Sequence, residues 1–207
     1  FEDALRLVRR RGELMQQAAV ASPSGMVSLV GADEATARAL CDRARSGDVL
    51  SPANFNCPGQ IVLSGSRSAC ERAVVLAGEF QCRAVQLAVA GAFHSPLMQS
   101  AADGLEPVLE QTRFTTPRMK VIANVDAEYH RDPGSIRDSL RRQVTQPVLW
   151  QRCVERMIED GVGQFVEIGP GRILTGLMRK INRNVPCVNA STTETLAAGM
   201  TVASSSP

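Results

Sequence analysis

The sequence is poor in long apolar runs and in charge of one sign, and each shortage excludes a class of protein. Its longest apolar runs, such as VQLAVAGAF, are far too short to span a bilayer, and no secretory signal is visible, so we expect no membrane partner. The formal net charge is only +2, so we expect no nucleic-acid partner either. With 207 residues, 44% of them hydrophobic, the chain can still bury a sizeable core.

Patterns typical of metal and nucleotide sites are also missing. No P-loop and no dinucleotide fingerprint occurs, and the cysteines show neither C-x-x-C spacing nor pairing with His. We therefore expect reduced, mostly buried thiols in the cytoplasm or in a reducing organelle, with disulfides or zinc as the open alternative. The thiols are those of Cys41, Cys57, Cys70, Cys82, Cys153 and Cys187.

What the sequence does contain is a regular alternation of strand and helix patterns. Apolar residues at helical spacing predict one long helix over 1–20. Residues 25–90 then predict the order β-α-β-β-α-β, which is the split βαβ or ferredoxin-like unit. The strands are expected at 25–31, 48–56, 60–66 and 82–90, and the helices at 32–47 and 67–80.

The second half predicts a parallel, doubly wound sheet, because strands and helices alternate along it. A buried strand is expected over MKVIANV. The other strands are expected at 163–169 and 185–191, and the helices at 96–113, 135–143, 147–160 and 171–181. We expect a tail over 193–207 that is briefly helical and then frayed.

His94, one of only two histidines, lies in the stretch GAFHSPLM, between an apolar strand pattern and a helix start. A lone histidine there either fills space or serves as a general base at the ligand-binding edge of a sheet. Small Gly91 and Ala92 favour the second interpretation, because they allow close backbone approach. The sequence offers no partner for a base: the G-x-S-x-G elbow is absent, and Ser64 in LSGSRS lacks the second glycine.

Six separated motifs along the whole chain resemble one family. They are RGELMQQA, NFNCPGQIVLSG, GAFHSPLM, ANVDA, QVTQPVLW and EIGPGRILTGL, in that order. The chain resembles the C-terminal two thirds of the malonyl-CoA:acyl carrier protein transacylase family, which is related to the acyltransferase domains of polyketide synthases. In that family a G-H-S-x-G elbow precedes the first of these motifs. The resemblance thus implies that the nucleophilic serine lies about a dozen residues before Phe1, and that the natural N-terminus is elsewhere.

The same resemblance implies an α/β fold with a parallel-sheet, hydrolase-like core, incomplete in this chain, and an inserted ferredoxin-like βαββαβ subdomain. It places a helix of the large subdomain at 1–22 and the small subdomain at 23–90. The large subdomain continues over 91–192.

Two residues acquire substrate-binding roles from the resemblance. Arg11, otherwise part of a solvated RRR run, is expected to clamp the free carboxylate of a malonyl group, since a guanidinium meets a carboxylate through two parallel hydrogen bonds. Phe93, otherwise a core residue, is expected to leave no room for an α-methyl group beside the acyl pocket, a discrimination worth roughly 1–3 kcal/mol.

Other positions acquire weaker expectations. The main-chain carbonyl of Gln143 is implied to accept the proton of the His94 imidazole. Asn56 and Gln60 are implied to lie over the substrate cleft, with ordinary turn chemistry as the alternative, and Asn124 is implied to lie near it, with packing as the alternative. The turn Gly169-Pro170-Gly171 either receives an anion at a helix start or is simply tight.

The function implied is transfer of a malonyl group from malonyl-CoA to acyl carrier protein in fatty-acid biosynthesis, with His94 and Gln143 catalytic and Arg11, Phe93 and Asn56 substrate-binding. The mechanism needs no metal or redox cofactor. We expect a monomer, inactive as this fragment alone, and Arg137, Arg141, Arg142, Arg179, Lys180 and Arg183 are candidates for docking an acidic carrier protein. A hydrolase-like thioesterase and a non-catalytic fragment that binds the carrier protein remain the alternatives.

Overall fold

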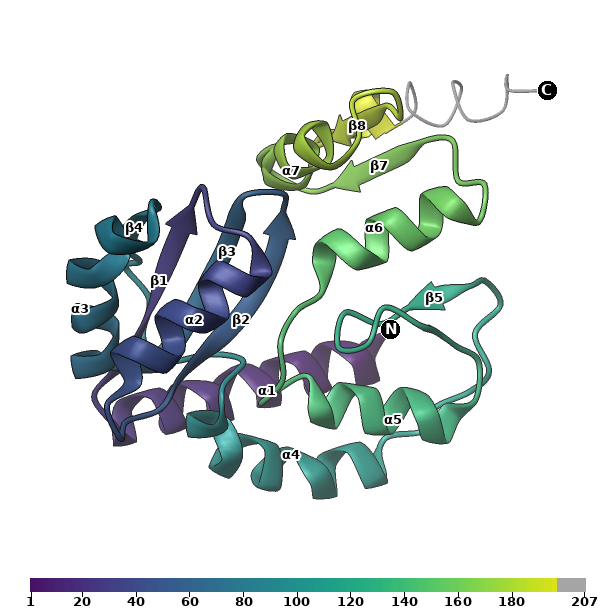
Figure 1. Cartoon of the computed structure of the whole chain (residues 1–207). Coiled ribbons are helices and arrows are strands. Elements are labelled where there is room, and N and C mark those ends of the chain that lie inside the picture. Colours follow the sequence, from purple (N-terminus) through teal and green to yellow (C-terminus); the bar gives the residue numbers. More distant parts are fainter. Residues whose placement is uncertain (197–207) are drawn as a thin grey trace. The chain divides into compact units, whose positions relative to one another are not determined.

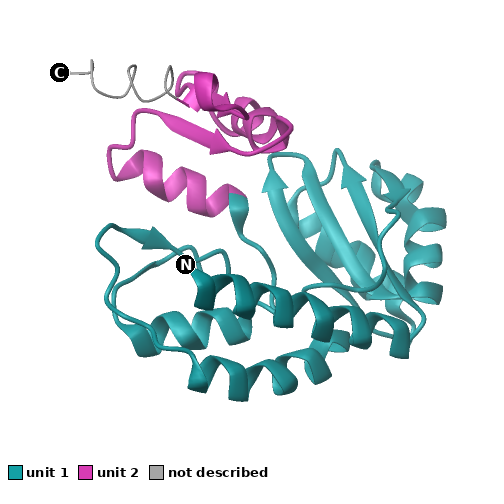
Figure 2. Cartoon of the chain, turned by 180° about the vertical axis from the view of Figure 1, so that it is seen from behind, with its two compact units in different colours: residues 1–150 teal, residues 151–207 magenta. Residues whose placement is uncertain are grey.

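The computed structural model describes residues 1–196, which form two compact units, 1–150 and 151–196 (Figure 2). Residues 197–207, most of the predicted tail, lie outside the described residues. The predicted subdomain boundaries at 22 and 90 fall inside the first unit, and the boundary near 150 was not predicted. Within residues 1–196, no helix combines the length and apolar character that crossing a bilayer requires.

The first unit opens with α1, Glu2–Ala21, which confirms the predicted long helix. Its second half buries one face at helical spacing, through Leu14, Met15, Ala18 and Ala19. Its first half is exposed on its apolar side, at Leu5 and Val8. Burial in this unit therefore holds mainly the C-terminal half of α1, with Leu7 the apolar residue of the first half that packs against the same core.

A four-stranded antiparallel sheet follows, with the strand order β2-β3-β1-β4 (Figure 1). The predicted β-α-β-β-α-β order is present, and the short helix η1 follows α3. The elements are β1 Ser24–Val30, α2 Glu34–Arg45, β2 Leu50–Cys57, β3 Gln60–Ser66, α3 Arg67–Leu76, η1 Ala77–Phe80 and β4 Arg83–Gln86. β4 is shorter than predicted and ends at Gln86. Leu87 still donates its N–H to the carbonyl of Met26 in β1, and the chain then leaves the sheet.

The two faces of this sheet bury different cores, as strand alternation requires. Val27, Leu29 and Leu63 face α2 and α3 and form the larger cluster with Leu40. The opposite face buries Met26, Ala53 and Val62, with Phe93 packed against them. The second face is the one that meets the loop carrying His94.

Three further helices complete the first unit around a separate core. They are η2 Pro96–Met98, α4 Gln99–Gln111 and α5 Pro133–Arg142. Met98 and Leu105 pack with Leu14 and Met15 of α1, and Val144 closes this cluster. Between α4 and α5 the chain makes a small antiparallel hairpin, β5 Val121–Ile122 and β6 Tyr129–His130.

The second unit is a βαβ arrangement preceded by a helix that begins at the boundary, α6 Trp150–Glu159. β7 Phe165–Ile168 and β8 Cys187–Ala190 pair in parallel, connected by α7 Ile173–Ile181. These strands and α7 lie where the sequence predicts them. Residues 193–196 are helical, as expected for the start of the tail.

The predicted parallel, doubly wound sheet is wrong for the strand over MKVIANV. That strand is only two residues long, it pairs antiparallel with β6, and Met119 and Val121 are 75% and 45% exposed. Apolar composition indicates that a segment prefers burial but does not say what covers it, and no core cluster of the described residues includes these two side chains. Among residues 1–196, only β7 and β8 pair as parallel strands.

The cysteines are mostly buried, as the sequence predicts. All six are free, four are buried, and Cys82 and Cys187 are partly exposed. Burial raises the pKa of the Cys41 thiol to about 12 and that of the Cys70 thiol to about 11, which makes both poor nucleophiles.

Candidate active site

The loop that carries His94 lies tightly against α1. A Cβ atom on Gly91 would stand 2.5 Å from Cβ and 2.9 Å from Cα of Ala19, so only glycine allows this approach. The N–H of Ala92 donates to Ser24 Oγ at 3.2 Å, and Ser95 Oγ donates to the carbonyl of Ala92 at 2.7 Å. The loop is thus fixed on both sides of the histidine.

His94 itself has φ +58°, in the left-handed region that side-chain-bearing residues rarely adopt. Such strain persists only where the surrounding structure determines it, and it concentrates at functional sites. The next residues begin η2 with Pro96 at its first position, where the missing N–H costs nothing.

The imidazole of His94 is oriented by the main chain of Gln143. Nδ1 lies 2.8 Å from the Gln143 carbonyl oxygen, and because a carbonyl only accepts, Nδ1 carries the proton and donates it. Nε2 is then the basic nitrogen of the neutral ring. The predicted contact between these two residues is present in the structure.

Gln143 is placed at the end of α5, where helical carbonyls lack helical partners. Its own side chain donates to the carbonyls of Gln146 and Pro147, at 3.0 and 3.1 Å, and so folds the following turn. Its carbonyl is left for His94. The amide side chain therefore has a structural task, and the main chain faces the imidazole.

His94 and Arg11 line the same pocket, of about 420 Å³. Its other lining residues come from α1, β1, β2 and the histidine loop, and they are Gly12, Met15, Gln16, Met26, Asn54 and Phe93. All of them belong to the first unit. The convergence of the imidazole and the guanidinium, which the sequence interpretation requires, is present.

Arg11 is a partly buried cation without a partner in the described residues. Its neighbours Arg9 and Arg10 both donate to Glu13, whereas Arg11 makes no hydrogen bond or ion pair within residues 1–196. Burial lowers the pKa of its guanidinium from the ordinary value. An unpaired, desolvated guanidinium facing a pocket is suited to bind an anionic group.

The same burial keeps the histidine neutral. Burial lowers the pKa of His94, the Gln143 carbonyl opposes this, and the positive charge of Arg11 adds to the lowering. A neutral imidazole at neutral pH can accept a proton, as a general base must.

Asn56 is not among the residues that line this pocket, and Asn54 is. The ladder pairs Phe55 with Ile61 and Cys57 with Gln60, which leaves Asn56 as the extra residue of a β-bulge. A bulge re-aims side chains, and no signal in the sequence located it. The substrate contact predicted for Asn56 stays a prediction, and so does the role of Gln60.

Two other predicted positions have structural tasks. The carbonyl of Asn124 accepts the N–H of Leu149 at 2.7 Å. The turn Gly169-Pro170-Gly171 precedes α7. The N–H groups of Leu174 and Thr175, in the first turn of α7, donate to the Glu167 carboxylate, each at 2.9 Å. The protein's own side chain thus occupies the proposed anion site, and tight-turn chemistry explains the glycines, since Gly169 and Gly171 have positive φ.

The first patch of candidate docking arginines is already paired. Arg142 binds Asp126 and Asp138, Arg141 binds Asp138, and Arg137 lies over the Phe114 ring. Charge counted along a sequence does not reveal such pairing. Docking by these residues or by Arg179, Lys180 and Arg183 stays a prediction.

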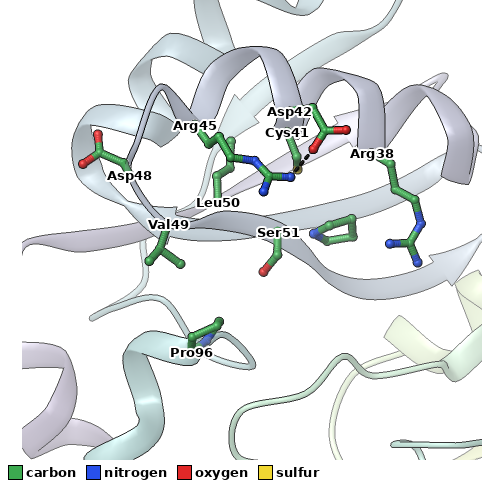
Figure 3. A pocket seen from close by; sticks show the side chains of 10 residues that line it. Arg38, Cys41, Asp42, Arg45, Asp48, Val49, Leu50, Ser51 and Pro96 are labelled. Atoms are coloured by element: carbon green, nitrogen blue, oxygen red, sulfur yellow. Dashed lines mark hydrogen bonds and ion pairs between the residues drawn. The ribbon is translucent and has the colours of Figure 1, made fainter.

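A second pocket, of about 410 Å³, lies between α2, the start of β2 and Pro96 (Figure 3). Its charges are balanced: Arg45 is paired with Asp42, as the dashed line in Figure 3 marks, Arg38 with Glu34, and Asp48 with Arg72. Its only thiol, that of Cys41, is buried with a raised pKa. This pocket holds no activated nucleophile or base.

Within residues 1–196, no three His, Cys, Asp or Glu side chains gather as metal ligands would.

A histidine held by a main-chain carbonyl and an unpaired arginine line one pocket of an α/β protein, so a base and a receptor for an anionic group lie at one site. The chain belongs to the acyl transferase domain family, whose model matches residues 1–201.

The chain is 38% identical over 182 residues to the malonyl CoA-acyl carrier protein transacylase of Salmonella typhimurium, a match that covers 87% of this chain and 59% of that protein. The crystal structure of the malonyl CoA-acyl carrier protein transacylase from Clostridium perfringens has a TM-score of 0.93 at 36% identity, covering 99% of this chain and 65% of that one. A malonyl-transacylase in complex with its type II PKS acyl-carrier protein has a TM-score of 0.91 at 40% identity, covering 96% and 65%. The chain thus spans less than two thirds of the length of these relatives.

Proposed function

We propose that the longer protein represented by this chain transfers a malonyl group from malonyl-CoA to the phosphopantetheine thiol of acyl carrier protein. One observation carries the proposal: His94, hydrogen-bonded at 2.8 Å to Gln143, and the unpaired Arg11 line one pocket. A general base and a carboxylate receptor at one acyl-sized site match a malonyl thioester. The transacylases to which the chain is similar act, by their names, between these two partners.

In this proposal His94 is the general base of both half-reactions. Nε2 accepts the proton of a serine hydroxyl, the serine oxygen bonds to the thioester carbonyl carbon, and the carbon–sulfur bond breaks. Coenzyme A leaves as the thiol with that proton. The thiol of acyl carrier protein then attacks the malonyl-serine ester, giving its proton to Nε2, and the serine regains a proton as it leaves.

The family resemblance implies a nucleophilic serine upstream of Phe1, and among the described residues no serine lines the pocket of His94 and Arg11. Ser64 is completely buried within β3. Ser95 is also buried and donates its hydroxyl to Ala92. No metal or redox cofactor takes part in the steps proposed.

Arg11 and Phe93 provide selectivity in the proposal. The guanidinium binds the free malonyl carboxylate, and an acetyl group would leave it buried and unpaired. Losing one side of such a pair costs on the order of 3–5 kcal/mol. The Phe93 ring, partly buried against Met26, Ala53 and Val62, restricts the space for an α-methyl group. Asn54 also lines the pocket and can contact the acyl group.

We further propose that the sheet β2-β3-β1-β4 with α2 and α3 is a ferredoxin-like subdomain inserted into a hydrolase-like core. The antiparallel order and the β-α-β-β-α-β sequence of elements support the first part. The parallel β7-α7-β8 unit supports the second.

The test is a malonyl-transfer assay with the full-length gene product, holo acyl carrier protein and malonyl-CoA. His94→Ala is expected to lower kcat/KM by about 10²–10⁴-fold, the usual contribution of a general base. Arg9→Ala is the control, since Arg9 is exposed and bonded to Glu13. Release of free malonate without transfer would indicate a thioesterase instead. Unchanged transfer by His94→Ala would contradict the proposal.

A further inference from the structure

The carboxylate of Asp126, in the turn between β5 and β6, accepts hydrogen bonds from three residues. Its oxygens accept the N–H of Glu128 at 3.2 Å, His130 Nε2 at 3.1 Å and a terminal guanidinium nitrogen of Arg142 at 2.8 Å. Burial alone would raise the pKa of this carboxyl, but the bonds from Arg142 and His130 outweigh it and hold the pKa below the ordinary value. The carboxylate is therefore charged at neutral pH.

The ion pair between Asp126 and Arg142 links the turn between β5 and β6 to the C-terminal end of α5. Asp126 and Arg142 have side chains only 24% and 29% exposed, so water and salt screen them less than an open surface pair. Arg142 is the last residue of α5, and the next residue, Gln143, supplies the carbonyl that orients His94.

The backbone from Arg142 to Gln146 forms a closed turn. The carbonyl of Arg142 accepts the N–H groups of Thr145 and Gln146, at 3.1 and 2.9 Å. The Gln143 side chain donates to the carbonyl of Gln146. Little freedom is left inside this turn, so its placement as a whole decides where the Gln143 carbonyl points.

The far end of the same segment is tied on two sides. Leu149 donates its N–H to the Asn124 carbonyl at 2.7 Å, in the same turn that carries Asp126. Val148 bridges the edge strand β2, accepting the N–H of Phe55 at 2.9 Å and donating to the carbonyl of Ala53 at 2.8 Å. Both ends of 142–149 are thus anchored to the β5–β6 turn, and the near end depends on Asp126.

We propose that Asp126, through its ion pair with Arg142, is a positioning residue for His94. Helix ends fray unless they are held, and a hydrogen bond weakens steeply as its angle departs from linear. By holding the end of α5, the ion pair keeps the Gln143 carbonyl in line with Nδ1 and so keeps the proton on that nitrogen. The consequence for catalysis rests on the proposed function, whereas the consequence for the imidazole does not.

The experiment reads the tautomer of His94 directly by ¹⁵N NMR of the histidine-labelled 207-residue chain. The chain has only two histidines, and a His130→Gln variant assigns the two sets of signals. In Asp126→Asn we expect the ratio of the Nδ1–H to the Nε2–H tautomer of His94 to fall by about threefold to tenfold, the scale of one net hydrogen bond.

Asp138→Asn is the matched control. Asp138 also binds Arg142, at 2.7 Å, but it lies on α5 itself and is more exposed, so it ties the arginine to no other element. We expect this variant to keep the wild-type tautomer ratio. An unchanged ratio in a folded Asp126→Asn, or an equal loss in Asp138→Asn, overturns the proposal.

Arg142→Lys covers the case in which Asp126→Asn fails to fold. A lysine keeps the charge but cannot reach Asp126 and Asp138 together, so we expect a smaller fall of the same ratio, and a wild-type ratio overturns the proposal. In the full-length protein, the Asp126 variant should lower kcat with KM unchanged. If no variant transfers malonyl at all, the proposed function fails while the tautomer ratio still decides the positioning role.

Discussion

Arg11 carries a partly buried guanidinium, and residues 1–196 supply no counter-charge for it. Burial of this unpaired charge lowers the free energy of unfolding, and a substitution can measure the effect. Without a ligand, Arg11→Gln should not destabilise the chain, because the substitution removes an unpaired desolvated charge. A carboxylate ligand should stabilise only the wild type. At 100 times its Kd, a ligand adds about 2.7 kcal/mol to the free energy of unfolding.

Thermal unfolding of the 207-residue chain with monomethyl malonate measures this effect. The Tm of the wild type should rise with ligand concentration and that of Arg11→Gln should not. Dimethyl malonate, which lacks the carboxylate, should shift neither protein. Arg10→Gln is the control, since Arg10 is bonded to Glu13. An equal rise in Arg11→Gln would show that the carboxylate binds elsewhere.

His94 predicts a pH dependence of opposite sign to that of a salt-bridged histidine. Its pKa in the folded chain is lowered below the ordinary value of 6.5 by burial, so the unfolded chain binds the proton more readily. The stability that this difference contributes is complete above the unfolded pKa. It is lost as the pH falls from about 6.5 through the folded pKa.

Urea unfolding at pH 7.5 and pH 5.5 tests the sign. The wild type should lose more free energy of unfolding between the two pH values than His94→Gln, which does not titrate. An NMR titration should give His94 a midpoint below that of a free imidazole. A midpoint above 6.5 would mean that the ring is stabilised in its charged form by a partner.

The residues that the sequence located are those with local signals. His94 follows a strand pattern with small residues before it, and family resemblance added Arg11 and the Gln143 carbonyl. Asn54 was not named because the resemblance pointed to Asn56, and the two register irregularities of β2 leave no periodic trace in the sequence. Asp126 was missed because its partner, Arg142, is sixteen positions away in another element.

At the scale of elements, the contact of the histidine loop with α1 is the one most sensitive to volume. A methyl group at position 91 would stand 2.5 Å from Cβ of Ala19, so Gly91→Ala must push the loop away from α1. Overpacking of this kind typically costs about 1–3 kcal/mol. Urea unfolding should show that loss, and the NMR signal of the His94 Nδ1 proton should broaden.

Gly176→Ala is the control for that substitution. Gly176 lies within α7, where an added Cβ meets no atom within 4 Å, so alanine should stabilise the helix by about 0.5–1 kcal/mol. Equal effects of the two substitutions would contradict the close approach seen at Gly91.

Elements with strong periodicity were predictable and the short ones were not. α1, α2, β1 and β3 appear where the apolar spacing puts them. The β5–β6 hairpin has strands of two residues, which is too short for any alternation to be read. An anion site before α7 was one of two alternatives, and Glu167 occupies that position: its carboxylate caps the helix from the preceding strand, a contact that only the fold brings about.

At the scale of the whole molecule, every described part of the candidate site belongs to the first unit. The pocket residues, the Gln143 carbonyl and the pair Asp126–Arg142 all lie within 1–150. The two core clusters that support α1 and the histidine loop are also contained there. The subdomain boundaries at 22 and 90, which the family resemblance implies, lie inside this unit and stay a prediction.

A fragment of residues 1–150 should therefore keep the His94 geometry without the second unit. We expect its ¹⁵N histidine spectrum to retain the Nδ1–H tautomer of His94, and its Tm to rise with monomethyl malonate as in the 207-residue chain. Asp126→Asn in the fragment should lower the tautomer ratio as in the longer chain, since both partners of the ion pair are present. If the folded fragment loses that tautomer while the 207-residue chain keeps it, the second unit contributes to the orientation of His94, and the site is not confined to residues 1–150.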